Sequence, residues 1–268
     1  MAASIITKNN ITVTGNTTAA QTIMFGHGFG TDQTSFANVV KPFEQQYRIV
    51  LFDNAGGGKS DIESFNPMRY NTLNGYVTDL LDICRHLELK DIVYVGHSVN
   101  GMVSLLASNK APQFFSKLLL LGASPRYLND PANNYTGGFN QSDLDGLYEA
   151  MNTNYYAWVS GFSKLAMSNE DQPQLAEQFA GTLAAIRPDI ALAVAKAIFQ
   201  TDHRADLAKS TTPTLVMQTS DDIAVPESVG IYMQANIPGS SLLKVKAKGH
   251  FPQISAPAEV VEAIQSFI

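Results

Sequence analysis

Along this chain, short apolar runs alternate with amphipathic stretches. Most of the runs are continuous rather than alternating, which is typical of strands covered on both faces of a parallel sheet. The stretch Leu73–Leu89, in contrast, places its apolar residues on one helical stripe. Strands that alternate with such helices predict an α/β fold with a mostly parallel, doubly wound sheet and right-handed crossovers. The predicted strands are Ile11–Thr14, Thr22–Phe25, Arg48–Phe52, Ile92–Val95, Lys117–Leu121, Thr214–Gln218 and Leu242–Lys246.

One stretch, Leu128–Leu207, breaks this alternation because it contains no run typical of a strand. A turn region rich in glycine and asparagine comes first, and helical patterns follow over Ser142–Met167, Gln174–Ala185 and Pro188–Phe199. A simple crossover between parallel strands takes about a dozen residues, far fewer than this insertion. We therefore expect a core made of residues 1–127 and 208–268 and a helical cap made of residues 128–207.

The composition is that of an ordinary globular protein, with 45% of the 268 residues hydrophobic and 16% charged. The formal net charge is −6 and no run of Lys or Arg stands out, so nucleic acid is not an expected partner. We see no secretory signal pattern and no apolar run of about 18 residues, and we expect no membrane association. The single cysteine, Cys84, has no partner for a disulfide, so we expect a buried, inert thiol and a cytoplasmic location.

The first candidate for chemistry is Ser98, in the sequence Gly96-His97-Ser98-Val99. A predicted strand precedes it and a helix-compatible stretch follows, which is the context of a nucleophile elbow. The usual pattern is G-x-S-x-G, whereas here the second glycine comes one residue late, at position 101. Seen alone, the motif also fits an ordinary helix whose first residue is capped by a serine.

A glycine-rich loop, Gly26-His27-Gly28-Phe29-Gly30, directly follows the strand Thr22–Phe25. In the elbow architecture one oxyanion donor comes from such a loop and the other from the residue after the nucleophile. We therefore predict that the backbone N–H groups of Phe29 and Val99 form the oxyanion hole. His27 is expected to orient the loop, since a catalytic histidine in this architecture comes last in the chain.

Two later strands each end in a residue that completes a catalytic triad. His250 follows one strand, and Asp221 and Asp222 follow the other, which gives the order Ser, Asp, His. Open α/β sheets bind ligands at the carboxyl ends of their strands. An imidazole can take the proton of a serine, and a carboxylate can fix its tautomer. The pattern alone does not decide between the two adjacent aspartates.

At these residues the sequence resembles the α/β-hydrolase superfamily. More narrowly, it is similar to the branch that holds the bacterial stress-response regulator RsbQ and the plant strigolactone and karrikin receptor hydrolases. The similar segments are GHGFGTDQ at 26–33, GHSV at 96–99, GASPRYLND at 122–130, GGF at 137–139, AWVSGF at 157–162 and DIAVP at 222–226.

The resemblance carries several implications for individual residues. The D-x-x-V-P pattern of the family selects Asp222 as the triad acid. A cap of four helices is implied over a deep apolar pocket, with Phe29 and His97 near its floor. The aromatic residues that would line the pocket are Tyr127, Trp158, Phe162, Phe179 and Phe199, although an aromatic stripe at helical spacing also fits simple packing of the cap. The chain departs from its relatives at Asn100 and Gln253.

These features predict a serine hydrolase that needs neither cofactor nor metal. It would cleave small hydrophobic esters or lactones through an acyl-enzyme on Ser98. An alternative is a signalling regulator, similar to RsbQ, that binds or slowly hydrolyses a small ligand and contacts a regulatory protein partner. Cofactor-free C–C hydrolases and perhydrolases share the same triad and also fit, whereas haloalkane dehalogenases and epoxide hydrolases carry an aspartate at the position of Ser98.

Overall fold

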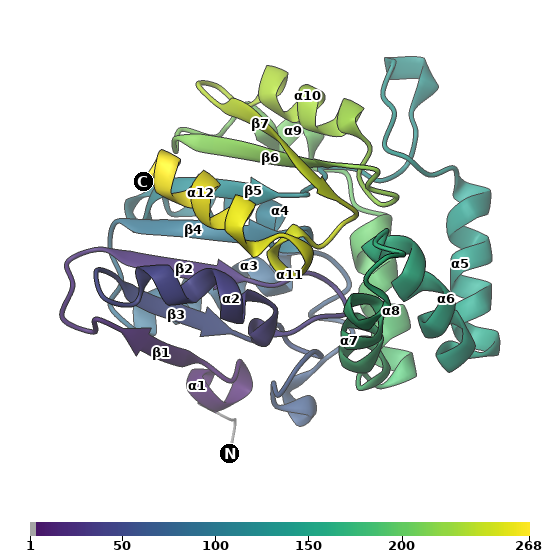
Figure 1. Ribbon diagram of the computed structural model, residues 1–268, viewed down its shortest axis with the longest axis horizontal. Coiled ribbons are helices and arrows are strands. Elements are labelled where there is room, and N and C mark those ends of the chain that lie inside the picture. Colours follow the sequence, from purple (N-terminus) through teal and green to yellow (C-terminus); the bar gives the residue numbers. More distant parts are fainter. Residues whose placement is uncertain (1–3) are drawn as a thin grey trace.

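A seven-stranded sheet in the order β1-β3-β2-β4-β5-β6-β7 forms the centre of the structure, a computed structural model that describes residues 4–268 (Figure 1). β1 runs antiparallel to β3, and the other pairs are parallel. All seven predicted strands are present, and the predicted class, a mostly parallel α/β sheet, is confirmed. The strands are β1 (Thr12–Gly15), β2 (Thr22–Gly26), β3 (Arg48–Phe52), β4 (Ile92–His97), β5 (Phe115–Leu121), β6 (Thr214–Ser220) and β7 (Ser241–Lys248).

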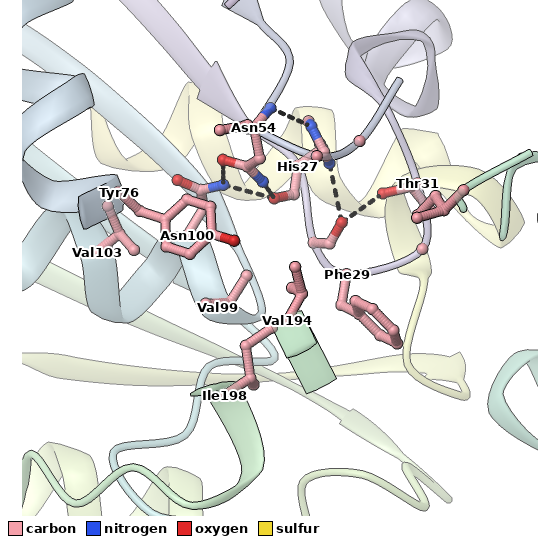
Figure 2. Close-up of a pocket in the computed structure, with 16 residues that line it drawn as sticks. His27, Phe29, Thr31, Asn54, Tyr76, Val99, Asn100, Val103, Val194 and Ile198 are labelled. Carbon is pink, nitrogen blue, oxygen red and sulfur yellow. Dashed lines mark hydrogen bonds between the residues drawn. The ribbon is translucent and has the colours of Figure 1, made fainter. Parts of the chain in front are cut away.

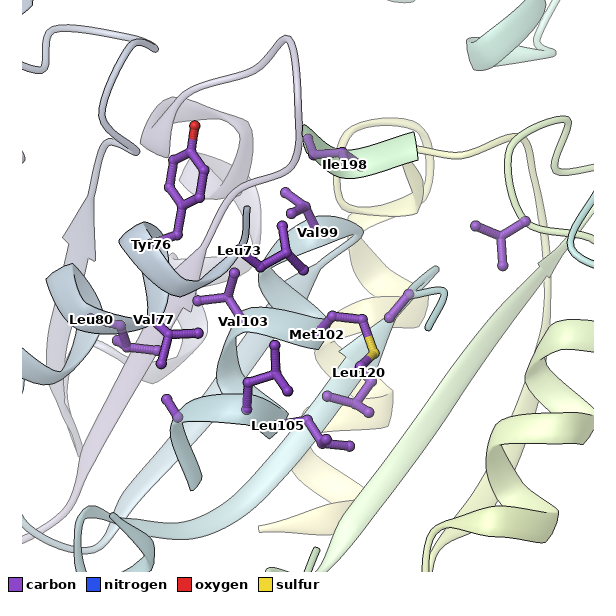
Figure 3. Packing of buried hydrophobic residues seen from close by; sticks show 14 of the residues in the cluster. Leu73, Tyr76, Val77, Leu80, Val99, Met102, Val103, Leu105, Leu120 and Ile198 are labelled. Atoms are coloured by element: carbon purple, nitrogen blue, oxygen red, sulfur yellow. The ribbon is translucent and has the colours of Figure 1, made fainter. Parts of the chain in front are cut away.

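Helices cover both faces of the sheet, which explains why the strands are apolar throughout. On one face lie α3 (Asn74–His86), α4 (Val99–Lys110) and α10 (Glu227–Asn236), and on the other α2 (Ala37–Val40) and α12 (Pro257–Phe267). Successive side chains of a strand point to opposite faces. In β4, accordingly, Tyr94 packs in the first core and Val95 in the second. Figure 3 shows part of the first core, where residues of α3 and α4 meet above the sheet.

The predicted stripe over Leu73–Leu89 forms helix α3, which ends at His86. Cys84 lies on its buried face with no exposed surface, and burial raises the pKa of its thiol to about 12. This environment keeps the sulfur protonated and unreactive at neutral pH. Short helices complete the connections: α1 (Ile5–Lys8), α9 (Arg204–Leu207) and α11 (Pro252–Ser255).

Between β5 and β6 the chain forms helices only, apart from isolated bridges. The four longer ones are α5 (Gln141–Thr153), α6 (Tyr155–Met167), α7 (Pro173–Ala184) and α8 (Pro188–Phe199), and Figure 1 shows them beyond one end of the sheet. The helical pattern over Ser142–Met167 is interrupted at Asn154, which leaves the helical conformation and accepts a hydrogen bond from the amide of Ala157 at 3.1 Å. One predicted pattern therefore gives two helices, because an asparagine at this point caps the second.

Within residues 4–268, no helix combines the length and apolarity needed to cross a lipid bilayer.

Candidate active site

Ser98 stands at a sharp turn between β4, which ends at His97, and α4, which begins at Val99. Its backbone has φ 54° and ψ −121°, a conformation that residues with side chains rarely adopt. The turn is too tight for a side chain at Gly96, where a Cβ atom would lie 2.5 Å from the carbonyl oxygen of Asn100. The hydroxyl of Ser98 makes no capping hydrogen bond to α4. The strained turn thus places the hydroxyl of this buried serine beside His250, 2.8 Å from Nε2, rather than at the cap of the helix.

Three side chains from the ends of three strands form one hydrogen-bonded chain. His250 Nε2 lies 2.8 Å from Ser98 Oγ, and His250 Nδ1 lies 2.8 Å from Asp222 Oδ2. The other carboxylate oxygen of Asp222 accepts bonds from the amides of Ala224 and Val225 at 2.9 and 3.1 Å. Because the carboxylate accepts from Nδ1, the proton of a neutral imidazole sits there. Nε2 is then free to accept the serine proton.

The structure separates the two aspartates that the residue pattern left equivalent. Asp221 adopts a left-handed backbone with φ 52°, its side chain is 65% exposed, and it lies 3.6 Å from Lys248 Nζ. The side chain of Asp222, in contrast, is fully buried against His250. Only Asp222 therefore has the geometry of a triad carboxylate.

The glycine-rich loop that follows β2 approaches Ser98 closely. A Cβ atom at Gly28 would lie 2.4 Å from His97 Nδ1 and 3.1 Å from the Cβ of Ser98, so only glycine fits. Within residues 4–268, the backbone amides of Phe29 and Val99 donate no hydrogen bond. The amide of Val99 is also the first of the twelve-residue helix α4, where the helix dipole favours negative charge. Phe29 precedes Ser98 in the sequence and Val99 follows it, and each has a free amide. This is the order that an oxyanion hole of this architecture requires.

Asn100, noted above as a departure from the family pattern, ties the elbow to this loop. It is fully buried. Its Oδ1 accepts a bond from Tyr94 Oη at 3.0 Å. Its Nδ2 donates to the carbonyl of His27 at 2.6 Å and to Asn54 Oδ1 at 3.0 Å (Figure 2). Sequence reasoning missed Asn54, although it lies two residues beyond the end of β3 and so at the same edge of the sheet.

His27 is held in one neutral form. Its Nε2 accepts a bond from the backbone amide of Asn54 at 2.9 Å, so the proton lies on Nδ1, which donates to the carbonyl of Gly28 at 2.9 Å. Burial lowers the pKa of the imidazole, and the nearby carboxylate of Asp53 only partly opposes this effect. The expectation that His27 orients the loop fits these contacts.

His97 lies behind the triad rather than at a cavity wall. Its Nε2 donates to the carbonyl of His250 at 2.7 Å, and its ring packs on Phe251 with centroids 5.1 Å apart. Burial lowers the pKa of His97 well below its usual value. Nearby, Gln253 is fully buried, and neither atom of its amide has a hydrogen-bond partner within residues 4–268.

A cavity of about 20 Å³ opens directly above the serine. Of the predicted pocket residues, Tyr127, Phe162 and Phe199 line it, whereas His97, Trp158 and Phe179 do not. Trp158 stacks on Phe162 at 4.9 Å, and Phe179 packs on Phe251 at 4.2 Å, so both support the wall from behind. The full lining is Phe29, Ser98, Tyr127, Phe162, Ile198, Phe199, Ala224, His250 and Phe251.

This cavity is much smaller than the deep pocket that the resemblance implied. Three residues that the sequence analysis did not select, Ile198, Ala224 and Phe251, occupy part of its wall. The lining holds no Lys, Arg, Asp or Glu. A charged group would therefore enter without a countercharge, which costs several kcal/mol.

Comparison with known families decides the classification of the chain. A family model described as the alpha/beta hydrolase fold matches residues 21–257. The chain belongs to the α/β-hydrolase family. The strained serine between β4 and α4 is the feature that this family places at its nucleophile elbow.

This α/β hydrolase has curated relatives and a solved structural neighbour over nearly its whole length. It is 41% identical to a karrikin insensitive 2 receptor of Petunia hybrida, with 96% of this chain and 94% of the relative covered. It is 40% identical to a strigolactone esterase of Pisum sativum, with 99% and 98% covered. A hydrolase from Oleispira antarctica superposes with a TM-score of 0.94 at 32% identity, over 98% of this chain and 96% of that one. The predicted resemblance to the strigolactone and karrikin receptor hydrolases is confirmed.

Proposed function

We propose that this α/β hydrolase cleaves small, uncharged carboxylic esters or lactones, with Ser98 as nucleophile, His250 as acid–base and Asp222 as the orienting carboxylate. The observation that carries the proposal is the chain of two 2.8 Å hydrogen bonds that links these side chains. Such an arrangement activates a hydroxyl for attack on a carbonyl. A relative at 40% identity is named a strigolactone esterase, which supports an ester or lactone as the substrate class.

The reaction proceeds in two stages. Ser98 Oγ attacks the carbonyl carbon while its proton passes to His250 Nε2, and the amides of Phe29 and Val99 bind the resulting oxyanion. The ester C–O bond then breaks, and His250 returns the proton to the leaving alcohol. Water attacks the acyl-enzyme with His250 as base, the acid leaves, and the hydroxyl of Ser98 is restored. Asp222 stabilises the imidazolium in both stages.

Residues 128–207 act in this proposal as a cap over a core of residues 1–127 and 208–268. Two contacts couple the segment to the catalytic loops. The carbonyl of Ala166 in α6 accepts a bond from the amide of His250 at 2.8 Å, and Thr182 in α7 donates to the carbonyl of Gly30 at 2.8 Å. Since the cavity of about 20 Å³ holds little more than a water molecule, a substrate must displace cap side chains to enter.

A second function shares this site. A relative at 41% identity is named a karrikin receptor, which favours a regulator that binds or slowly hydrolyses a small ligand and then contacts a protein partner. The two functions differ in turnover. An esterase releases product many times per active site, whereas a receptor with slow hydrolysis gives at most a few turnovers.

The test uses p-nitrophenyl esters of increasing acyl length and a fluorophosphonate probe. We expect repeated turnover of short acyl esters and covalent labelling of Ser98, both abolished in Ser98→Ala. Ser108→Ala, which changes a buried serine elsewhere in α4, is the matched control and should retain both. Labelling that persists in Ser98→Ala would overturn the assignment. Labelling of Ser98 with a single burst of product would favour the receptor function.

A further inference from the structure

A second cavity, of about 30 Å³, lies next to the catalytic one. The two share the side chains of Phe29 and Ile198 as a common wall. Val99, whose amide is a proposed oxyanion donor, also lines the second cavity. This space therefore begins immediately behind the position where a substrate carbonyl would sit.

Among the side chains that line the second cavity, the phenol of Tyr76 is a hydrogen-bond donor without a partner. This residue of α3 is only 6% exposed, and its hydroxyl has no hydrogen-bond partner within residues 4–268. Figure 2 shows the hydroxyl directed into the space between Val99 and Val194. Buried polar groups nearly always have a partner, and each exception calls for a physical reason. Burial raises the pKa of Tyr76 far above neutrality, so the phenol stays protonated and can donate.

The other polar side chains around the cavity are already engaged, and the free amides of Phe29 and Val99 are those assigned to the oxyanion. The side chains of Asn54 and Asn100 bond to each other and to the carbonyl of His27. Burial lowers the pKa of His27, which keeps its ring neutral. The lining holds no Lys, Arg, Asp or Glu. A matching ligand group is therefore uncharged, mostly apolar, and carries a single hydrogen-bond acceptor.

The position of His250 decides which part of a substrate reaches this cavity. His250 must deliver a proton to the leaving oxygen, and it lines the catalytic cavity but not the second one. The alcohol side of an ester therefore stays with His250. The acyl side points the other way, across the wall formed by Phe29 and Ile198.

We propose that the second cavity is the acyl subsite of this hydrolase and that Tyr76 selects acyl chains carrying a distal carbonyl or ether oxygen. The inference rests on the proposed ester hydrolysis at Ser98 and names its substrate class more closely. As at the catalytic cavity, an acyl chain must displace side chains to enter a space of about 30 Å³. Tyr76 is a specificity determinant here and takes no part in bond making or breaking.

The experiment compares p-nitrophenyl esters in matched pairs. One member of each pair is a straight alkanoate, and the other has the same length with a ketone at one defined position along the chain. At the position that reaches Tyr76, we expect kcat/KM for the oxo ester to exceed that for the alkanoate by about fivefold, the ratio typical of one neutral hydrogen bond. In Tyr76→Phe this ratio should fall to about one.

Two further variants keep the result interpretable. Tyr148→Phe removes another phenol that lacks a partner within residues 4–268 but lines neither cavity, and it should keep the wild-type ratio. Val194→Phe fills the second cavity and should raise the preference for acetyl over longer acyl groups by more than tenfold, while also abolishing the oxo preference. This arm tests the subsite even where Tyr76→Phe fails to fold.

The outcomes separate the inference from the proposed function. A ratio near one at every ketone position, or a preference that survives in Tyr76→Phe, would overturn the subsite and leave the phenol bonded to water only. Turnover of alkanoates and labelling of Ser98 would persist in that case. Absence of both turnover and labelling would instead refute the proposed ester hydrolysis itself.

Discussion

Leucine in place of Asn100 removes three hydrogen bonds from the base of the active site. Tyr94, Asn54 and the carbonyl of His27 each lose a bond of 2.6 to 3.0 Å in a fully buried position. At about 1 kcal/mol for each neutral bond, the free energy of unfolding should fall by about 3 kcal/mol. The carbonyl of His27 lies two residues before the amide of Phe29, so the loop that carries this proposed oxyanion donor loses its anchor to α4.

Asn100→Leu should also lower kcat, because the loop that it frees carries the amide of Phe29. Removing an oxyanion donor outright lowers kcat by about 10²–10³, and a displaced donor should cost part of this, about 10- to 100-fold. KM should change by less than about threefold, because the donor binds the transition state more strongly than the ground state. Initial rates on p-nitrophenyl acetate, with urea unfolding in parallel, measure both effects.

Ser104→Ala provides the matched control. It removes a buried bond of 2.7 Å in the same helix, to the carbonyl of Gly101, without touching the oxyanion loop. We expect it to lower stability and leave kcat within about twofold. Should Asn100→Leu lower kcat no more than this control, Asn100 would stabilise the fold only, and its assignment as a positioning residue would be wrong.

Three other changes test separate parts of the site. Asp222→Asn should lower steady-state activity by about 10⁴ through loss of tautomer control. The activity of Asp221→Asn should stay within a few-fold of the wild type, and the reverse result would exchange the roles of the two aspartates. Trp158→Ala removes a support behind the cavity wall, so the variant should accept esters with bulkier groups. Its kcat on acetyl esters should stay within about tenfold of the wild type. Loss of acetyl esterase activity in a folded protein would place Trp158 in the catalytic centre. Because burial lowers the pKa of His97 below its unfolded value, the unfolded state binds the proton first as pH falls. The free energy of unfolding should then fall by up to about 1.4 kcal/mol for each unit by which the pH drops below about 6.5. Denaturant unfolding of His97→Asn should show a shallower fall over the same pH range.

The sheet was predictable from the sequence because its strands are buried on both faces and therefore leave long apolar runs. The candidate triad could be proposed from the sequence for a related reason, since each of its residues comes a few residues after such a run. The choice of Asp222 over Asp221 was not accessible from the residue pattern. It depends on a left-handed turn at Asp221 that sends one side chain to solvent and the next toward His250.

The residues that line the walls of the two cavities were harder to predict than the candidate triad. Ile198 and Phe251 are apolar residues in helical or loop segments, where packing and ligand contact leave the same pattern. Their neighbours Phe199 and His250 were selected, so a search one residue to either side of each candidate would have found them. Tyr76 gave no signal, because it lies on the same helical stripe as ordinary core residues and only the missing partner of its hydroxyl distinguishes it.

The backbone of Ser98 has a consequence for how this enzyme can change over generations. A non-glycine residue held at φ 54° and ψ −121° costs about 1–3 kcal/mol relative to a relaxed conformation. Glycine would occupy the same turn without that penalty, yet it would carry no hydroxyl. Selection for heat resistance alone would thus favour loss of the proposed nucleophile. Directed evolution for stability therefore needs a screen for ester turnover at every round, because we expect Ser98→Gly to be more stable and inactive.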